Sequence, residues 1–185
     1  LDYFRGEKSV NVKGISSLAV DLTSEKSVSN LSGYFNKDTT VIMCSGIKSD
    51  YGNDADTCMK NILMAKNVSS ALDRYPVKGF VLFSSIAVYG VDINNLNITE
   101  DTEINADTYY GLSKYVSEIL ISLAIKKNSS SYFVRLRTPT IYGAGDKINA
   151  HTPSGFLNTF MDGGEVTLFG DGSELREFIY IDDIV

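Results

Sequence analysis

Short apolar segments rich in β-branched and aromatic residues alternate with longer helix-like segments along most of this chain. The short segments have the length of strands and lie at Ser17–Val20, Thr40–Cys44, Phe80–Phe83 and Tyr132–Leu136. The longer segments predict helices at Ser24–Tyr34, Asp54–Arg74 and Thr108–Lys127. Strands that alternate with helices make right-handed crossovers, which produce a parallel sheet covered by helices on both faces. The pattern therefore predicts a doubly wound, Rossmann-like α/β fold that binds ligands at the carboxyl ends of its strands.

The pattern changes after Gly143 to glycine-punctuated loops, with a short helix near Phe156–Met161 and brief strands near Val166 and Phe178. We therefore expect a partial cofactor-binding domain at residues 1–143 and a partial, small substrate-binding region at residues 144–185. The Gly-x-Gly at Gly143–Gly145 is expected to form a turn. Both ends of the sequence look abrupt, so the chain is expected to be a fragment truncated at both ends.

Composition narrows the classes of function. The chain has 185 residues, 43% of them hydrophobic, which is enough for a sizeable core. Its formal net charge of -6 argues against binding to nucleic acid or an anionic membrane, and no apolar run approaches the roughly 20 residues of a membrane span. Cys44 and Cys58 are too few for a disulfide framework or a metal site, which favours a reducing, cytoplasmic setting. Cys44 ends an apolar run and is expected to be buried.

A phenol and an ammonium, Tyr110 and Lys114, lie four residues apart on one predicted helix and therefore on the same face. A tyrosine transfers protons near neutral pH only if its pKa, ordinarily about 10, falls by roughly 3 units. A fixed cation in a desolvated cleft could largely supply that shift. The spacing alone is equally compatible with a solvated pair on a helix surface.

Two serines follow the apolar strand at Phe80–Phe83. Ser85 is expected at the carboxyl edge of the sheet, where its hydroxyl can donate to a substrate oxygen whose charge changes during reaction. Ser84 is expected to act as a strand-end cap. His151, the one histidine of the sequence, lies in a loop and is given no catalytic role.

Two motifs, Ser-Ser-Ile-Ala-Val-Tyr-Gly at residues 84–90 and Tyr-Gly-Leu-Ser-Lys at residues 110–114, resemble the extended short-chain dehydrogenase/reductases. Within these enzymes they are most similar to the NAD-dependent epimerase/dehydratase family, in particular to UDP-glucose 4-epimerase-like proteins. The resemblance extends over nearly the whole chain through four further segments, at residues 41–48, 61–68, 136–143 and 170–183.

The resemblance implies NAD as cofactor and a nucleotide sugar as substrate. Tyr110 would be the acid/base, Lys114 would adjust its pKa and bind a ribose, and Ser85 would hydrogen-bond the reacting sugar oxygen. The other implied cofactor contacts are Asp2, Asp21, Leu22, Cys44, Ser45, Gly46, Lys48, Asn61 and Pro139. The other implied substrate contacts are Thr140, Ser154, Gly155 and Arg176. For Arg176 and Lys48, an ordinary surface charge is the alternative.

The glycine fingerprint that binds a dinucleotide pyrophosphate is absent from the sequence. Residues 1–6 resemble the end of the family's second strand, one unit after that fingerprint. Asp2 would then occupy the position of the ribose-binding carboxylate, which favours NAD over NADP. Arg5 acts in the opposite direction, because a cation at this position would accommodate the additional phosphate of NADP.

The expected activity is NAD-dependent epimerisation of a nucleotide sugar through a transient 4-keto intermediate. The alternatives are a nucleotide-sugar 4-ketoreductase, a non-catalytic cofactor-binding member of the fold, and a fragment that is inert without its phosphate-binding loop. A 4,6-dehydratase is not expected, because such relatives carry an Asp-Glu pair where this chain has Ile86-Ala87. Thr140 replaces an asparagine common in UDP-galactose-type epimerases. Family members commonly pair through the helices equivalent to residues 54–74 and 108–127, so a homodimer is expected.

Overall fold

The computed structural model describes residues 10–90, 97–146, 153–168, 170–171 and 175–184. The chain forms two compact units, Leu1–Arg137 and Thr138–Val185. The expected division of function, with cofactor binding before and substrate binding after residue 143, stays a prediction.

The first unit contains a parallel sheet of three strands in the order β1-β2-β3. The strands are β1 (Thr40–Met43), β2 (Gly79–Phe83) and β3 (Tyr132–Leu136). Val41 lies opposite Phe80, which lies opposite Phe133. Because all three strands run the same way, the segments that leave their carboxyl ends emerge at one edge of the sheet. The predicted Rossmann-like α/β fold is confirmed.

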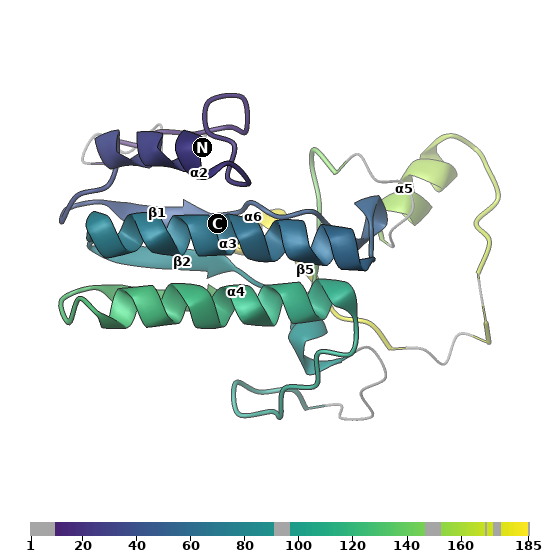
Figure 1. The fold of residues 1–185 in the computed structure, drawn as a ribbon. Helices are drawn as coiled ribbons and strands as arrows, with labels where there is room; N and C mark the ends of the chain where they lie inside the picture. Colours follow the sequence, from purple (N-terminus) through teal and green to yellow (C-terminus); the bar gives the residue numbers. More distant parts are fainter. Residues whose placement is uncertain (1–9, 91–96, 147–152, 169, 172–174, 185) are drawn as a thin grey trace. The chain divides into compact units, whose positions relative to one another are not determined.

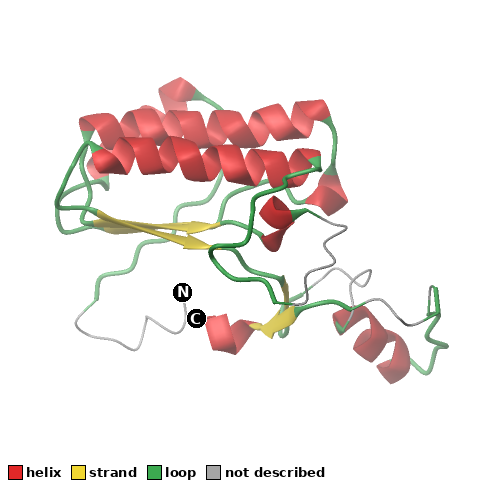
Figure 2. Ribbon diagram, turned by 90° about the horizontal axis from the view of Figure 1, so that it is seen from below, coloured by secondary structure: helices red, strands yellow, loops and turns green. Residues whose placement is uncertain are grey.

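Two long helices, α3 (Ala55–Arg74) and α4 (Tyr109–Lys126), lie side by side in one layer over the sheet (Figures 1 and 2). Each begins at a side-chain cap, as polar residues before a helix predict. Asp54 accepts a hydrogen bond from the Thr57 amide at 2.8 Å, and Thr108 accepts one from the Gly111 amide at 3.0 Å. Shorter helices are α2 (Glu25–Val28), η1 (Ser29–Gly33), η2 (Ser49–Tyr51) and η3 (Ile86–Tyr89).

The hydrophobic core of this unit lies between the helix layer and the sheet. Phe80 on β2 and Ile121 on α4 are fully buried there, and Val68 on α3 is 3% exposed. On the opposite face of the sheet, the side chains of Ile42 and Val134 are exposed. The helices α3 and α4 are therefore held against one face of the sheet by close apolar packing.

Two expected strands are wrong. Ser17–Val20 forms a turn, in which the Ser16 carbonyl accepts hydrogen bonds from the amides of Ala19 and Val20, both at 3.0 Å. These local bonds occupy backbone donors that a strand would present to a neighbour. The segment around Val166 is irregular rather than extended in a sheet.

The second unit contains a small sheet in which β4 (Thr140–Tyr142) pairs in parallel with β5 (Phe178–Tyr180). Its helices are α5 (Ser154–Met161) and α6 (Ile181–Ile184). The expected turn after β4 is confirmed, since Gly143 and Gly145 have φ angles of 138° and 90° and the Asp146 amide donates to the Gly143 carbonyl. Among the helices in the described ranges, none is long and apolar enough to cross a membrane.

The core packing generates a stability prediction. Phe80→Ala removes a fully buried ring and should lower the free energy of unfolding of the full-length protein by about 3–5 kcal/mol. Leu18→Ala, at a side chain that is 98% exposed, should change it by less than about 0.5 kcal/mol. Urea unfolding followed by circular dichroism measures both values, and equal effects of the two substitutions would contradict the assignment of the core.

Candidate active site

The face of α4 that packs against the sheet is polar at four positions. Ser113, Lys114, Ser117 and Glu118 are all buried, whereas the apolar side chains of Ile119 and Leu123 on the same helix are exposed. Burying polar and charged groups costs free energy unless each finds a hydrogen-bond partner. A helix face with this arrangement is more typical of a functional site than of a structural core.

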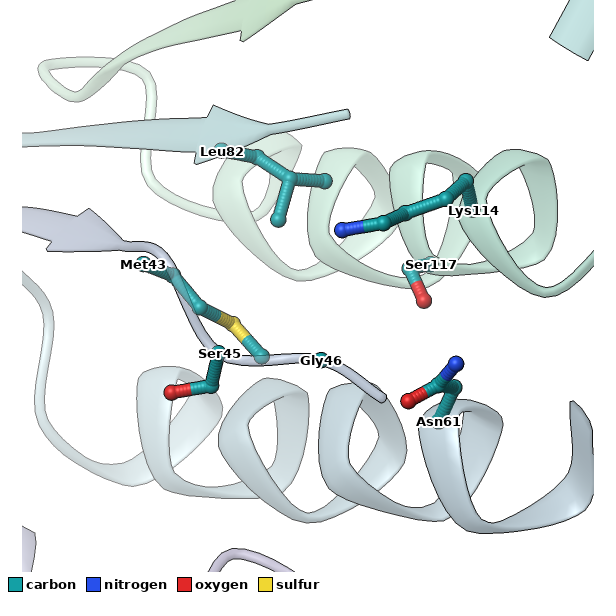
Figure 3. Close-up of a pocket in the computed structure, with 7 residues that line it drawn as sticks. All are labelled: Met43, Ser45, Gly46, Asn61, Leu82, Lys114 and Ser117. Atoms are coloured by element: carbon teal, nitrogen blue, oxygen red, sulfur yellow. The ribbon is translucent and has the colours of Figure 1, made fainter. Parts of the chain in front are cut away.

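Lys114 is 8% exposed and points from α4 towards the carboxyl end of β2, as Figure 3 shows. Its Nζ donates a hydrogen bond of 2.8 Å to the Phe83 carbonyl. An ammonium has three donors, so Lys114 can also donate to a ligand. Burial lowers the pKa of Lys114, and the charges of Cys44 and Glu118 oppose this by raising it.

Tyr110 is partly buried at the start of α4, and the Nζ of Lys114 lies 5.6 Å from the centroid of its ring. Its amide donates to Oδ1 of Asn53 at 3.1 Å. Burial raises the pKa of Tyr110 above its ordinary value, and Asp50 raises it further, while a hydrogen bond with the Ser85 hydroxyl lowers it. In the free chain desolvation dominates this pKa, and the Lys114 ammonium is directed at the Phe83 carbonyl, so the expected lowering of the Tyr110 pKa by Lys114 stays a prediction.

The capping role that the sequence suggests for Ser84 belongs to Ser85 in the structure. Ser85 is the N-cap of η3, where its Oγ accepts a hydrogen bond of 3.2 Å from the Ala87 amide. Ser84 is buried and donates instead to Oε1 of Glu118 at 2.6 Å. The expectation of a strand-end cap at Ser84 is therefore wrong. Ser85 lies at the carboxyl edge of β2, as expected.

Asn61 on α3 holds the loop that follows β1. Its Oδ1 accepts from the Ile47 amide at 2.7 Å, and its Nδ2 donates to the Ile47 carbonyl at 3.0 Å and to Ser113 Oγ at 3.3 Å. This fixes Gly46 so close to α4 that an added Cβ would lie 3.2 Å from Nζ of Lys114. Asn61 therefore shapes the site by positioning this loop.

A cavity of about 10 Å³, roughly the space of one water, lies where β1, β2, α3 and α4 meet. Figure 3 shows the residues that line it: Met43, Ser45, Gly46, Asn61, Leu82, Lys114 and Ser117. Cys44, expected to be buried, is exposed because it lies just beyond the end of β1. Partial shielding raises the pKa of its thiol, and the charge of Lys114 lowers it.

Three further residues implied as cofactor contacts lie in the first unit. Lys48 forms an exposed ion pair with Asp50 at 3.6 Å. The Asp21 carboxylate accepts hydrogen bonds from the amide and hydroxyl of Thr23, which hold its pKa below the usual range. The Leu22 carbonyl accepts a hydrogen bond from Asn67. Asp2 and His151 lie outside the described residues.

The other expected contacts belong to the second unit. Pro139 and Thr140 are partly buried, Ser154 and Gly155 are buried at the start of α5, and Arg176 is exposed. Their roles towards cofactor and substrate stay predictions. Among the residues that the structure describes, no group of three His, Cys, Asp or Glu side chains could hold a metal ion.

Sequence reasoning missed residues that support the site: the buried Glu118, the partly buried Arg137, and Asn53. Oε2 of Glu118 pairs with Nη2 of Arg137 at 2.8 Å. Glu118 follows Lys114 by one helical turn, and this i, i+4 spacing on the Tyr110 face was a signal available in the sequence.

The site combines a partly buried phenol, a strand-end hydroxyl and a buried ammonium at the carboxyl edge of a parallel sheet. The loop at Gly46 carries no side chain that would fill the space beside Lys114. These features fit a ligand that presents ribose hydroxyls to Lys114 and a reacting oxygen to Tyr110 and Ser85. They fit the nicotinamide end of NAD, which the sequence predicts as the cofactor.

Comparison with known proteins gives a family match over nearly the whole chain. The model of the NAD dependent epimerase/dehydratase family matches residues 5–185. UDP-glucose 4-epimerase of Lactobacillus helveticus is 31% identical over 150 residues, covering 73% of this chain and 43% of that protein. dTDP-glucose 4,6-dehydratase of Streptomyces griseus is 30% identical over 125 residues, covering 68% and 37%. The chain thus spans less than half the length of these relatives.

A solved structure with a similar fold is a mutant of UDP-glucuronic acid 4-epimerase from Bacillus cereus, in complex with NAD and UDP-4-deoxy-4-fluoro-glucuronic acid. Its TM-score is 0.72 at 22% sequence identity, over 99% of this chain and 55% of that one.

The buried ammonium leads to a prediction about stability and pH. Because burial lowers the pKa of Lys114, the unfolded state binds more protons between the folded value and 10.5, and stability rises with pH through that window. At pH 7 the folded protein carries the cost of the desolvated charge. Lys114→Met should therefore raise the free energy of unfolding by about 0.5–2 kcal/mol at pH 7, while turnover is lost.

Unfolding by urea at pH 7 and pH 10 measures this effect, and the gain should shrink at the higher pH. Lys60→Met, at an exposed position on α3, is the matched control and should change little. A lower stability of Lys114→Met at pH 7 would contradict the predicted sign.

Proposed function

The chain belongs to the NAD-dependent epimerase/dehydratase family, and we propose that it forms the core of a nucleotide-sugar epimerase that acts through a transient 4-keto intermediate. The observation that carries this proposal is the grouping of Tyr110, Lys114 and Ser85 at one edge of the parallel sheet. The pKa of Tyr110 responds to the Ser85 hydroxyl, and Lys114 Nζ lies 5.6 Å from the Tyr110 ring. An acid/base, a cation and a hydroxyl donor are the groups that reversible oxidation of an alcohol requires.

The residues of the first unit that would hold NAD are Lys114, Tyr110 and the loop at residues 44–46, with Asp21 and Leu22 towards its adenosine end. When bound, NAD would take a hydride from C4 of the sugar and return it, and its oxidised form would add a positive charge beside Tyr110. That charge matters because burial raises the pKa of Tyr110 in the free chain. A further cation nearby favours the phenolate and opposes this shift.

Tyr110 would accept the proton of the sugar C4 hydroxyl at its phenolic oxygen and give it back when the 4-keto group is reduced. Ser85, whose Oγ lies at the end of β2, would donate a hydrogen bond to the same sugar oxygen. Lys114 would remain an ammonium, held by the Phe83 carbonyl, and donate to ribose hydroxyls. Epimerisation then requires that the keto sugar turn over before it is reduced on its other face.

We further propose that the enzyme is not a 4,6-dehydratase, although a dehydratase is among its relatives. Loss of water across C5 and C6 requires an acid and a base beyond Tyr110. The residues directly after Ser85 are Ile86 and Ala87, which cannot move a proton. A 4-ketoreductase would need only the same three residues and is the second candidate. The identity to UDP-glucose 4-epimerase favours epimerisation.

The nucleotide sugar is identified by incubating the full-length protein and NAD with UDP-, dTDP-, GDP- and CDP-hexoses and reading the products by NMR. A hexose inverted at C4 supports the proposal. A 4-keto-6-deoxy product would overturn the exclusion of a dehydratase, and lasting consumption of NADH by a 4-keto sugar would favour the reductase.

Exposed apolar side chains on α3 and α4 support the proposal of a homodimer. Met59 and Leu63 on α3, and Ile119 and Leu123 on α4, are between 40% and 62% exposed. Apolar groups concentrated on the outer side of two adjacent helices are typical of protein–protein interfaces. A second copy of the chain is the proposed partner, which would pair these helices.

For catalysis, we predict that Tyr110→Phe lowers turnover by at least about 10²-fold, because general acid–base catalysis is worth 10²–10⁴-fold. NAD affinity should stay within about threefold, since the ring is retained and the change costs little binding energy. Tyr109→Phe, at the neighbouring exposed tyrosine, is the control and should keep wild-type turnover. Wild-type turnover in Tyr110→Phe would refute the assignment.

For assembly, we predict that Leu123→Lys converts a dimer of the full-length protein into a monomer, because it buries an unpaired charge at the proposed interface. Leu157→Lys, at an equally exposed leucine on α5, should leave the dimer intact. Light scattering coupled to gel filtration measures both masses. If Leu123→Lys still has the mass of a dimer, α4 is not part of the dimer interface.

A further inference from the structure

Glu118 extends the row formed by Tyr110 and Lys114 by one further turn on the same face of α4. It is fully buried, and the proton transfers proposed above do not use it. A carboxylate without exposure to water normally requires several hydrogen bonds and a counter-charge. Its partners therefore indicate what it does for the site.

Arg137, directly after β3, is the counter-charge. Its Nε donates to Oε1 of Glu118 at 3.0 Å and its Nη2 donates to Oε2 at 2.8 Å, so the pair is bidentate. The hydrogen bonds that Arg137 donates to Glu118 hold the pKa of Arg137 above its ordinary value. Paired forks of this kind fix orientation as well as distance.

The pair extends to the two segments on either side of Ser85. Ser84 donates to Oε1 of Glu118 at 2.6 Å, and Nη1 of Arg137 donates to the Tyr89 hydroxyl at 2.8 Å. The guanidinium also lies 5.0 Å from the centroid of the Tyr89 ring. Ser84 precedes Ser85, and Tyr89 ends the short helix η3 that Ser85 caps. The ion pair thus joins α4 to both ends of the Ser85 segment.

We propose that Glu118 and Arg137 are positioning residues that hold the Ser85 hydroxyl in register with Tyr110 and Lys114. The proposal rests on the proposed function, because it concerns the same three reacting side chains. A buried ion pair is weak evidence for stability, since two apolar side chains of similar volume often stabilise a fold equally well. Its connections suit a geometric role, because Glu118 lies on the helix that carries Tyr110 and Lys114, and the pair bonds to Ser84 and Tyr89 on either side of Ser85.

Replacing both residues of the pair tests its effect on the geometry of the reaction centre separately from its effect on the stability of the protein. Glu118→Leu/Arg137→Met in the full-length protein removes both charges together and leaves neither unpaired. We expect turnover to fall by at least about tenfold, because small misplacements of reacting groups cost one to two orders of magnitude. The KM should change by less than about threefold, since uniform substrate binding is retained. The temperature of unfolding should stay close to that of the wild type.

The matched control is Asp73→Leu/Lys127→Met, which removes the exposed ion pair between α3 and the end of α4. It should keep wild-type turnover. A folded Glu118→Leu/Arg137→Met enzyme with wild-type turnover would overturn the proposal. If that double variant does not fold, Glu118→Gln/Arg137→Met, which also removes both charges and keeps the shape of the Glu118 side chain, carries the same test with the same two outcomes.

Amide hydrogen exchange, read by mass spectrometry, tests the proposal without activity. Residues 83–90 should exchange at least about tenfold faster in Glu118→Leu/Arg137→Met than in the control, because local opening is governed by the contacts that hold a segment. Unchanged exchange would overturn the positioning role. Absence of any turnover in the wild type would instead defeat the proposed function, and the exchange result would still decide the role of the pair.

Discussion

Burial of a charged helix face against the end of a parallel sheet is the constraint on which the site depends. The ammonium of Lys114 and the carboxylate of Glu118 can be buried only because the sheet edge supplies partners, the Phe83 carbonyl for one and Ser84 and Arg137 for the other. Since these partners lie at the carboxyl ends of β2 and β3, they fix the register of α4 against the sheet. Apolar packing of Phe80 and Ile121 holds the two layers together.

The same burial shifts the pKa values of two residues in the free site. It raises the pKa of Tyr110 and lowers that of Lys114, so it favours the neutral form of both. A phenol that stays protonated in the free protein is suited to activation by a ligand that brings its own positive charge. Catalytic competence would then be coupled to cofactor binding through electrostatics, without any change of fold.

The sequence predicted the fold well where local signals agree with tertiary structure. Asp54 and Thr108 cap helices within a residue of the predicted starts, and three of the four predicted strands of this domain pair in parallel, as expected. The prediction of a strand at Ser17–Val20 was wrong, because four apolar-rich residues do not determine whether the backbone pairs with a strand or closes into a turn.

Tyr110, Lys114 and Ser85 could be predicted from motifs, and the spacing of Glu118 places it on the same helix face, but the pairing of Glu118 with Arg137 could not be predicted. Glu118 and Arg137 are 19 residues apart in sequence, and only the packing of α4 beside β3 brings them together. The sign of the Tyr110 pKa shift also depends on burial, which spacing alone does not reveal. The most direct test of the central claim, reversible oxidation of a sugar carbon at this site, uses full-length protein, NAD and a nucleotide hexose carrying deuterium at C4. The account predicts a product inverted at C4 that retains the deuterium, without net formation of NADH. Inversion with loss of the deuterium to solvent would contradict it.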